Sequence, residues 1–343
     1  MVLCAGLGTR LRPLTDVWPK PAVPLLGAPL VAYSFSLLKA AGLTRVGINT
    51  HHLPHVMESA ARSQAARLGL SLAVAPEDII QGTGGGIRGI AQALGERGPF
   101  VVLNGDAFFS VELAPLIDEH LDSGADATMV LLPMPEGEVF GAVEVDVNAT
   151  VRRISGHGPG GARLTPWHFS GVHIMSASVF EAMPKTGPFD INRDTYVRLM
   201  EEGGQVRGRV LHDARGYWSD VGTKERYART HRDLLHGQVA TDRFGDTSPF
   251  AFAQRQSFNA WAHPTARLSN VRVSGPAWFG QGAVLEEDVT VGGATSVGVG
   301  AHVGAGASLN RVAVLDGAVV EPGARWEDAI VAPGGVSLRG SAR

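Results

Sequence analysis

The chain has 343 residues, of which 44% are hydrophobic and 18% charged, and its formal net charge is −3. The composition is that of an ordinary globular protein, the length predicts two domains, and the lack of a basic excess argues against nucleic acid as a partner. The sequence contains no apolar stretch of membrane-spanning length and no signal-peptide layout, and with a single cysteine, Cys4, it predicts a cytoplasmic protein.

The chain opens on a short apolar run, Val2 to Ala5, which predicts a β-strand. The stretch 6–10 follows as a turn in which the backbone approaches a ligand closely, because glycine leaves N–H groups without a Cβ in front of them. Arg10, Arg12 and Lys20 lie in or just after this turn, and such cations favour an anionic ligand. Without them, a plain tight turn would be an equally good interpretation.

Strand and helix patterns alternate through the first 236 residues. Pro29 begins a helical stretch from Leu30 to Ala41, which Gly42 ends. Further strands are predicted over 45–49, 70–75, 100–103, 127–132 and 142–147, and further helices over 55–67, 86–94 and 112–123. This alternation predicts an α/β fold with a doubly wound, mostly parallel Rossmann-like sheet, in which ligands bind beyond the carboxyl ends of the strands.

A different period begins in the second half of the chain, where an aliphatic or aromatic residue recurs at every sixth position. The repeat consists of Val273, Phe279, Leu285, Val291, Val297, Val303, Leu309 and Leu315. A period of six is typical of a hexapeptide parallel β-helix, in which short strands stack into a column. We therefore expect a first domain over 1–236, a connecting segment over 237–262 and a short left-handed parallel β-helix over 263–343.

Two functions are open to a β-helix of this kind. Acyltransferases built on it need several full coils and a catalytic histidine, whereas the strict repeat here gives fewer than three coils and contains one histidine, His302. We expect a homo-oligomer assembled through the β-helix domain. The stretch 324–340 breaks the strict period and is predicted to cap the column.

Three stretches of the first half place reactive groups at predicted strand ends. They are the opening loop, a second glycine-rich turn over 75–89, and the two acids Asp106 and Asp220. The opening loop completes neither the G-x-G-x-x-G dinucleotide fingerprint nor the Gly-Lys-Ser/Thr of a P-loop. Two carboxylates beside phosphate-binding cations suit Mg²⁺ and a displacement at phosphorus, where positioning and charge neutralisation provide most of the catalysis.

Two adjoining motifs closely resemble the signature of the sugar-1-phosphate nucleotidylyltransferases: Gly6-x-Gly8-Thr9-Arg10-x-Arg12-Pro13-Leu14-Thr15 and Pro19-Lys20-Pro21. The later motifs of that family resemble, in order, Gly82-Thr83-Gly84, Asn104-Gly105-Asp106, Phe169-Ser170-Gly171 and Trp218-x-Asp220-Val221-Gly222-Thr223. The resemblance implies that residues 1–236 form a catalytic domain that transfers a nucleoside monophosphate from a nucleoside triphosphate to a sugar 1-phosphate. The products are an NDP-sugar and pyrophosphate.

The resemblance also implies a role for each matching residue. The nucleotide would be bound by Ala5, Gly6, Gly8, Thr9, Glu77, Gly82, Thr83, Asn104 and Gly105. Arg10 would hold the departing pyrophosphate, Lys20 would bind the α-phosphate and the incoming sugar phosphate, and Asp106 would complete the catalytic set. Asp106 and Asp220 would hold Mg²⁺. The sugar phosphate would be bound by Gly141, His157, Ser170 and Gly171.

One motif departs from the family pattern. Many members have Glu-Lys-Pro after the middle strands, where the lysine meets the sugar phosphate, whereas this chain has Gly156-His157-Gly158 at that place. His157, Arg153 or Arg163 would take over the contact. The stretches 83–87 and 168–172 most resemble a subgroup that includes mannose-1-phosphate guanylyltransferases and N-acetylmuramate-1-phosphate uridylyltransferases, and this subgroup also tends to lack Glu-Lys-Pro.

Glu77 bears on the choice of base. A carboxylate only accepts hydrogen bonds, and guanine offers it two adjacent donors. We therefore expect GTP with mannose 1-phosphate, and a uridylyltransferase acting on an amino-sugar 1-phosphate is the alternative. A catalytically silent NDP-sugar-binding regulatory subunit is a further one, although such a protein has no need of the acids at 106 and 220. Lys224 and Arg226, which open a helix after Gly222, are expected on a solvated face.

Overall fold

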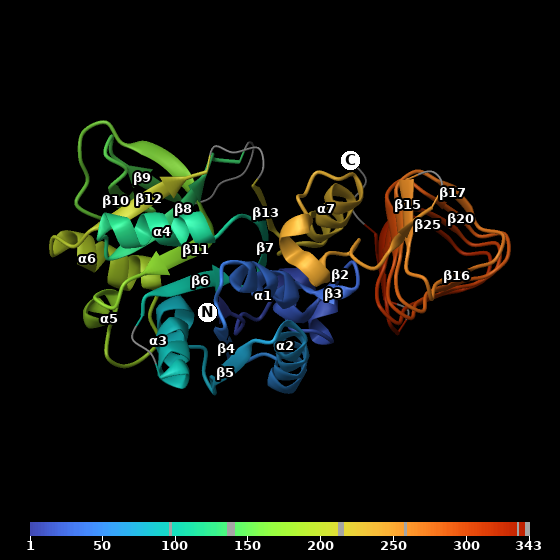
Figure 1. Cartoon of the computed structure of the whole chain (residues 1–343), viewed down its shortest axis with the longest axis horizontal. Coiled ribbons are helices and arrows are strands. Elements are labelled where there is room, and N and C mark those ends of the chain that lie inside the picture. Colours follow the sequence, from blue (N-terminus) through green and yellow to red (C-terminus); the bar gives the residue numbers. More distant parts are fainter. Residues whose placement is uncertain (96–97, 136–140, 212–215, 257–258, 335, 340–343) are drawn as a thin grey trace. The chain divides into compact units, whose positions relative to one another are not determined.

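A computed structural model describes residues 1–95, 98–135, 141–211, 216–256, 259–334 and 336–339, the last range by its backbone alone. Contacts divide the chain into two compact units, and Figure 1 labels their elements in chain order. Unit 1 comprises residues 1–7, 37–105 and 111–218, and unit 2 comprises residues 8–36, 106–110 and 219–343. Unit 2 therefore combines most of the opening signature with the C-terminal part of the chain.

Unit 1 is built on a nine-stranded sheet in the order β10-β9-β11-β6-β1-β4-β5, with β8 joining β11 to β12. Its strands are β1 (Val2–Leu3), β4 (Arg45–Thr50), β5 (Ser71–Pro76), β6 (Phe100–Asn104), β8 (Ala127–Leu132), β9 (Ala142–Val145), β10 (Val151–Ile154), β11 (Thr165–Met175) and β12 (Val206–Val210). Strands β5, β4, β1 and β6 run parallel, as the alternating pattern predicted. Strand β11 is antiparallel to β6, β8 and β9, so the sheet is mixed rather than mostly parallel.

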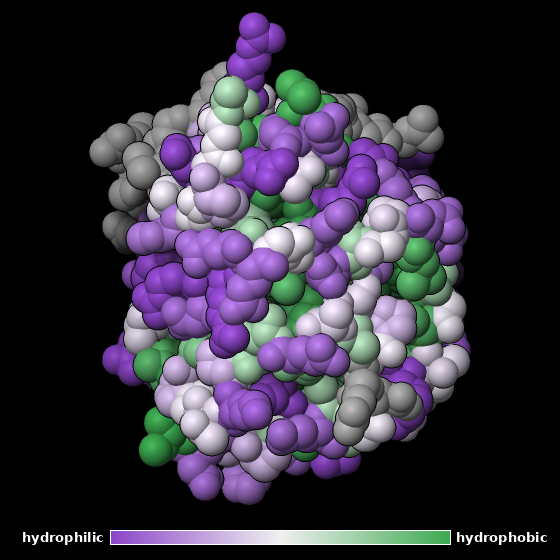
Figure 2. Space-filling view, turned by 90° about the vertical axis from the view of Figure 1, so that its left-hand side faces the viewer, coloured by the Kyte–Doolittle hydropathy of each residue, from purple (hydrophilic) through white to green (hydrophobic). Residues whose placement is uncertain are grey.

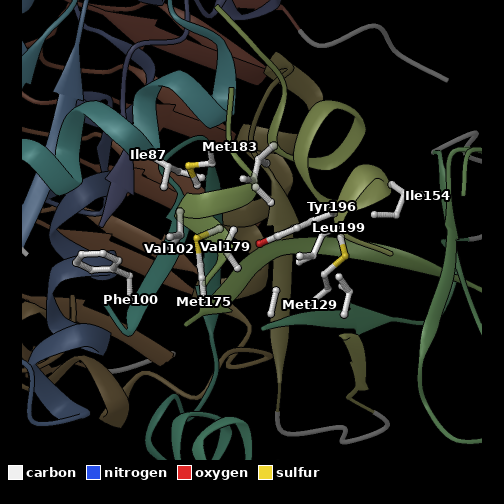
Figure 3. Packing of buried hydrophobic residues seen from close by; sticks show 14 of the residues in the cluster. Ile87, Phe100, Val102, Met129, Ile154, Met175, Val179, Met183, Tyr196 and Leu199 are labelled. Atoms are coloured by element: carbon white, nitrogen blue, oxygen red, sulfur yellow. The ribbon is translucent and has the colours of Figure 1, made fainter. Parts of the chain in front are cut away.

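The helices of unit 1 are α2 (Pro54–Leu68), α3 (Gly82–Leu94), α4 (Ala114–Ser123), α5 (Val179–Ala182), the π-helical turn η4 (Ile191–Tyr196) and α6 (Val197–Glu201). Helices α2 and α3 pack on β4 and β5. Side chains of α3, β6, β8 and β11 meet in one apolar core, in which Figure 3 shows Ile87, Val102, Met129 and Met175. This core fixes the strand ends that carry the motifs of unit 1.

Helix α3 begins at Gly82, whereas the hydrophobic pattern predicted a start at Gly86. Neighbouring side chains pack directly against the glycines at its start, where a larger residue would not fit. A Cβ on Gly84 would lie 2.1 Å from the ring of Phe189, and one on Gly86 would lie 2.5 Å from Asn49. Glycine disfavours helix on intrinsic propensity, so the sequence pattern missed the first turn. Close tertiary contacts decide the conformation here.

The signature segment of unit 2 folds into short turns rather than regular helices. Three 3-10 turns, η1 (Thr9–Leu11), η2 (Leu14–Asp16) and η3 (Lys20–Ala22), lead into a hairpin of β2 (Pro24–Leu25) and β3 (Ala28–Pro29). Helix α1 (Leu30–Ala40) follows and continues into unit 1. In unit 2 the ring of Tyr33 on α1 packs edge-to-face on Phe108 and Phe244.

Further elements of unit 2 frame this segment. They are β7 (Ala107–Ser110), which pairs with β13 (Tyr217–Asp220), helix α7 (Lys224–Leu235) and the 3-10 turn η5 (Asp242–Thr247). The hydroxyl of Tyr227 on α7 donates a hydrogen bond to the carbonyl of Pro24. His231, also on α7, pairs with Ser296, with 3.1 Å between Nδ1 and Oγ. Helix α7 therefore contacts both the hairpin and the C-terminal strands.

The C-terminal part of unit 2 is rich in short strands. They are β14 (Gln254–Arg255), β15 (Ala260–Ala262), β16 (Arg267–Leu268), β17 (Arg272–Ser274), β18 (Ala277–Phe279), β19 (Val284–Leu285), β20 (Thr290–Gly292), β21 (Thr295–Val297), β22 (His302–Val303), β23 (Ser308–Val314), β24 (Val319–Val320), β25 (Arg325–Ala332) and β26 (Val336–Arg339). We call residues 254–339 the coil domain. Parallel ladders stack Val273 on Val291 on Leu309, and Leu285 on Val303, and the side chains facing inward form a separate apolar core.

The six-residue spacing of the repeat is one residue shorter just before Val314. Val297 pairs with Val314 rather than with the predicted Leu315. The corner before Val314 is shortened around Arg311, whose φ of 56° lies in the left-handed region, and β23 runs through it as one strand. A strict count of six could not foresee this change, because the number of residues in a corner depends on the local backbone conformation.

Antiparallel strands flank the first and last rounds of one ladder. Strand β14 pairs antiparallel with β15, and β26 pairs antiparallel with β25, within the range predicted to cap the column. Such strands cover hydrogen-bonding edges that could otherwise pair with another chain. Figure 2 shows another part of the surface, the side that carries α6 in Figure 1, where hydrophobic residues lie in small separate groups on a largely hydrophilic face. Of the helices in the described ranges, none combines the length and apolarity needed to cross a membrane.

Candidate active site

A buried lysine joins two carboxylates in unit 2. The Nζ atom of Lys20 lies 3.1 Å from Oδ2 of Asp106 and 3.2 Å from Oδ1 of Asp220, and only 5% of the lysine side chain is exposed. Burial of an ammonium group is costly unless it is paired and hydrogen-bonded, and both carboxylates meet that need. We call Arg10, Lys20, Asp106, Asp220 and Arg226 the charged cluster.

The chain brings these residues together from four separate segments. Lys20 opens η3 between Pro19 and Pro21, whose fixed φ angles stiffen the backbone on both sides. Asp106 directly precedes β7, and Asp220 is the last residue of β13, which pairs with β7. The pairing of the two strands explains why acids that are distant in sequence share one ammonium group.

Asp220 is the centre of the charged cluster. Its Oδ2 lies 2.5 Å from Nη1 of Arg226 and 3.7 Å from Nη2 of Arg10, and its Oδ1 accepts the backbone N–H of Gly222 at 2.9 Å. Burial acts to raise the pKa of Asp220, but Lys20, Arg226 and Arg10 outweigh it and hold the pKa below its ordinary value. Asp220 is therefore ionised at neutral pH.

Arg226 was expected on a solvated face, but the structure places it against Asp220. Thr223 caps helix α7 by accepting the N–H of Arg226, which fixes the first turn of the helix. This turn presents the guanidinium to a carboxylate six residues earlier in the chain. The sequence signal that could have identified Arg226 was the helix-capping residue Thr223 directly after Asp220-Val221-Gly222, because it starts a helix close to the acid.

Glycines let the backbone of unit 2 pass close to the charged cluster. A Cβ on Gly222 would lie 2.6 Å from Oδ1 of Asp220 and 2.9 Å from Nη2 of Arg10, so a larger residue would displace these groups. Gly8 has a φ of 61°, and its carbonyl accepts a hydrogen bond from Oγ1 of Thr15 at 2.9 Å. Thr9 and Arg10 follow on the exposed side of η1. Predicted residues Gly8, Arg10, Lys20, Asp106 and Asp220 thus lie together in unit 2.

The nucleotide-binding residues predicted in unit 1 surround the ends of β1, β5 and β6. Ala5 and Gly6 follow β1, and the N–H of Gly105 after β6 donates to the carbonyl of Leu3. A Cβ on Gly105 would lie 2.5 Å from that carbonyl oxygen, so only glycine fits there. Asn104 lies next to Gly171, whose φ is 87° and whose missing Cβ leaves room for the amide.

Glu77 follows β5 and is held by its surroundings through both carboxylate oxygens. Its Oε1 accepts the side-chain N–H of Asn49 at 2.7 Å, and its Oε2 accepts the backbone N–H of Gln81 at 2.8 Å. The carbonyl of Glu77 lies 2.8 Å from Nδ1 of His51. Asn49 is a functional candidate that the sequence analysis missed, because a polar residue in a buried strand gives no signal of its partners.

Thr83, expected to face the base, is engaged within unit 1. Its hydroxyl donates to Oδ2 of Asp190 at 3.0 Å and accepts the N–H of Ile191 at 2.9 Å. Gly82 has a φ of 70°, and a Cβ there would lie 2.5 Å from the carbonyl oxygen of Phe189. The start of α3 is therefore fastened to the segment that leads into η4.

The residues predicted for the sugar phosphate fall into two places in unit 1. Ser170 and Gly171 lie at an irregularity of β11, where the hydroxyl of Ser170 donates to the carbonyl of Val130 at 2.7 Å. Gly141 and His157 are exposed and flank the turn at Ser155, where a Cβ on Gly141 would lie 2.2 Å from Oγ of Ser155.

The alternative contacts for the sugar phosphate also lie in this part of unit 1. Arg153, on β10, pairs with Glu144 at 3.6 Å, so part of its charge is already balanced. Arg163 is exposed and has a φ of 55°. Arg153, His157 and Arg163 are all exposed.

The acids of the charged cluster were also the predicted metal ligands. Within the described ranges, no three or more His, Cys, Asp or Glu side chains gather in a way that could enclose a metal ion. Mg²⁺ needs no such cage, because it commonly takes one or two carboxylates and completes its octahedron with phosphates and water. Asp106, whose side chain is half exposed, and Asp220 meet that requirement.

Comparison with known proteins agrees with the resemblance in the motifs. The chain is 30% identical to a mannose-1-phosphate guanylyltransferase from Mycobacterium tuberculosis over 94% of its own length and 81% of the relative. It is 26% identical to a UTP–glucose-1-phosphate uridylyltransferase from Synechocystis over 96% of its length and 86% of the relative. The crystal structure of HddC from Yersinia pseudotuberculosis shares the fold, with a TM-score of 0.54 and 23% identity, over 67% of this chain and 96% of that one.

A family assignment follows from the sequence profile. Residues 1–237 match the profile described as nucleotidyl transferase. The predicted resemblance to the sugar-1-phosphate nucleotidylyltransferases is confirmed, as is the expectation of an enzyme. The chain belongs to the nucleotidyl transferase family.

Proposed function

We propose that the protein transfers a nucleoside monophosphate from a nucleoside triphosphate to a sugar 1-phosphate. A phosphate oxygen of the sugar 1-phosphate attacks the α-phosphorus, the bond to the β-phosphate oxygen breaks, and pyrophosphate leaves with the electron pair. The observation that supports this most is the charged cluster, because Arg10, Lys20 and Arg226 outnumber Asp106 and Asp220. An excess of positive charge suits a polyphosphate ligand.

Each member of the cluster has a part in the proposed reaction. Lys20 neutralises charge on the α-phosphate and the incoming sugar phosphate, and Arg10, the most exposed of the cations, offers its planar fork to the departing pyrophosphate. Asp106 and Asp220 hold these cations in place before substrate binds. Groups that are oriented in advance need little reorganisation during the reaction, which is the basis of electrostatic catalysis.

Mg²⁺ is the metal that this donor set fits. Asp106 and Asp220 would hold it, and when bound it supplies further positive charge for the phosphates. In the described structure the Lys20 ammonium contacts both of these acids.

The proposed substrates are GTP and mannose 1-phosphate. The relative with 30% identity is named a mannose-1-phosphate guanylyltransferase, and further relatives from rice and yeasts carry that name. A uridylyltransferase acting on an amino-sugar 1-phosphate remains the alternative. The 26% identical relative named for UTP and glucose 1-phosphate supports its nucleotide but not its sugar. Because both oxygens of Glu77 already accept hydrogen bonds, the carboxylate by itself is a weaker argument for guanine than the bare sequence suggested.

The remaining predictions are part of the same proposal. Ala5, Gly6, Gly8, Thr9, Glu77, Gly82, Thr83, Asn104 and Gly105 bind the nucleotide, and Gly141, His157, Ser170 and Gly171 bind the sugar phosphate. We also propose the domain bounds predicted from the sequence: a catalytic domain over 1–236, a connecting segment over 237–262 and a β-helix domain over 263–343. The parallel ladders of the coil domain support a hexapeptide parallel β-helix. Its left-handed sense, and a homo-oligomer assembled through it, are part of the same proposal. The sequence has one cysteine, Cys4, and therefore no internal disulfide, which supports a cytoplasmic location.

Pyrophosphate release tests the activity and names the substrates. The purified protein is assayed with Mg²⁺ over a grid of nucleoside triphosphates and sugar 1-phosphates. Asp106→Asn removes an acid of the charged cluster, and Asp122→Asn is the matched control, because Asp122 is an exposed acid at the end of α4. Turnover with GTP and mannose 1-phosphate that is lost only in Asp106→Asn supports the proposal. Turnover only with UTP selects the alternative, and no turnover in any combination contradicts the function.

A further inference from the structure

We propose that Asn49 is a positioning residue of the nucleotide site, and the inference rests on the function proposed above. Asn49 is the residue before the end of β4, and it is buried. Its Oδ1 accepts the backbone N–H of Cys4 at 2.7 Å, and its Nδ2 donates to Oε1 of Glu77 at 2.7 Å. One amide thus joins the start of the signature loop to the loop after β5.

The orientation of this amide is fixed by its partners. The backbone N–H of Cys4 can only donate, so it requires the amide oxygen, and the ionised carboxylate of Glu77 can only accept, so it requires the amide NH₂. Gly86 on α3 leaves the necessary space, since a Cβ there would lie 2.5 Å from Nδ2 of Asn49 and 3.2 Å from Oε1 of Glu77. Asn49 therefore has a single productive arrangement.

Glu77 passes this constraint on to the loop that follows it. Its second oxygen accepts the N–H of Gln81, and its own N–H donates to the carbonyl of Thr50. Gln81 is the residue before α3, so Glu77 holds residues 78–81 as a closed turn. Asn49 acts on the bound nucleotide through this turn and through Cys4, without contacting the reacting phosphates.

This arrangement predicts which kinetic constant Asn49 controls. Loss of the amide loosens two loops that bind the nucleotide, whereas the charged cluster is built from residues of unit 2. In Asn49→Ala we expect the KM for GTP to rise about tenfold, the change that one lost buried hydrogen bond to a charged group produces. The kcat and the KM for mannose 1-phosphate stay within about twofold of the wild type.

Exchange of donor and acceptor provides a sharper test than removal. Asn49→Asp places a second carboxylate against Glu77 and should raise the KM for GTP and lower the melting temperature more than Asn49→Ala does. In the double variant Asn49→Asp with Glu77→Gln, the new amide at position 77 donates to the new carboxylate at position 49 and still accepts the N–H of Gln81. We therefore expect the double variant to have a higher melting temperature and a lower KM for GTP than Asn49→Asp alone.

The measurements are steady-state kinetics with each substrate varied in turn, melting curves, and calorimetric titration with GTP. Asn148→Asp is the matched control for the added charge, because Asn148 is exposed in the turn after β9, and it should leave every value unchanged. A double variant no better than the sum of its single changes overturns the inference. So does an Asn49→Ala variant that loses kcat and melting temperature with an unaltered KM, because that is the behaviour of a merely structural residue.

The two proposals fail in distinguishable ways. A wild-type chain that binds GTP but releases no pyrophosphate contradicts the proposed transfer. The titrations then decide the inference about Asn49: affinity that falls in Asn49→Ala, falls further in Asn49→Asp and is partly regained in the double variant supports it, and any other pattern overturns it. A wild-type chain that binds no nucleotide overturns both.

Discussion

Unit 2 contains two charged networks with similar partners and different roles. In the charged cluster, Lys20 pairs with two acids at 3.1 and 3.2 Å. In the coil domain, Arg311 pairs with Glu327 at 2.8 Å and with Asp328 through two nitrogen atoms at 2.7 Å each. The contacts of Arg311 are shorter than those of Lys20, although we assign no chemistry to the network of Arg311.

The two networks differ in burial, in assembly and in charge balance. The side chain of Arg311 is 39% exposed and its acids are more exposed still, whereas that of Lys20 is 5% exposed. Arg311 and its acids lie on β23 and β25, which are adjacent strands of one ladder. The charged cluster joins three regions far apart in sequence, 10–20, 106 and 220–226. Tight pairing therefore stabilises a surface, and an excess of cations around a buried lysine marks the candidate site.

Lys20→Ala should have the largest effect of any single change. It removes the ammonium that neutralises the reacting phosphates and leaves Asp106 and Asp220 without their shared partner. We expect kcat/KM to fall by about 100- to 1000-fold, as on loss of an oriented charge-stabilising group. Pyrophosphate release measures the loss, and Lys39→Ala, at an exposed lysine near the end of α1, is the control. Activity within threefold of the wild type would remove Lys20 from the site.

Arg226→Ala should have the next largest effect. Asp220 loses its nearest cation, at 2.5 Å, and is then less firmly oriented toward Lys20. Hydrogen bonds to charged groups contribute about 1.5–3 kcal/mol, so we expect kcat/KM to fall by about 10- to 100-fold. Arg226→Lys should recover part of the activity because it keeps the charge.

The control for Arg226 lies on the same helix. Arg229 is an exposed arginine of α7 whose partner is Asp233, at 3.7 Å, and Arg229→Ala should leave kcat/KM unchanged. Equal effects of the two alanine variants would mean that Arg226 stabilises α7 rather than the candidate site.

Asp316 is a buried carboxylate of the coil domain that accepts a hydrogen bond from a backbone N–H, and its pKa is raised. Its Oδ1 accepts the N–H of Val299 at 2.9 Å, and burial raises its pKa to about 6. A raised pKa means that the folded state binds the proton more tightly than the unfolded state, so stability is greatest below the ordinary pKa near 3.9 and declines as the pH rises through 6.

Asp316→Asn should remove that part of the pH dependence. Between pH 4 and pH 7 we expect the wild type to lose about 1–3 kcal/mol more of its free energy of unfolding than Asp316→Asn does, because one pKa unit corresponds to about 1.4 kcal/mol. Urea unfolding at a series of pH values measures the difference. Parallel curves for the two proteins would show that Asp316 titrates normally.

Arg311→Ala should have the smallest effect. Exposed ion pairs contribute about 0–1 kcal/mol, so we expect the free energy of unfolding to fall by about 1 kcal/mol or less, with kcat/KM unchanged. Urea unfolding together with pyrophosphate release checks both values. A loss of activity comparable to that of Lys20→Ala would end the distinction between the two networks.

Local pattern was sufficient for much of the fold. The alternation of strand and helix signals gave the parallel strands β4, β5 and β6, and the six-residue period gave the coil domain up to Leu309. Both rest on side-chain periodicity, which is a property of neighbouring residues. The predicted start of α3 at Gly86 was wrong, because contacts with residues distant in sequence decide where the helix begins. The predicted repeat position at Leu315 was also wrong, because a shortened corner of the backbone brings Val314 into the ladder instead.

The sequence by itself determined the family, since the glycines, cations and acids of its motifs stand in a fixed order along the chain. It also named Lys20, Asp106 and Asp220, but not the contacts among them. Only the tertiary structure decided that Arg226 joins Asp220 and that Asn49 holds Glu77. The physical reason is that the sequence does not specify which group a charged or amide side chain will contact. That partner is determined only when the strands pair and the helices pack.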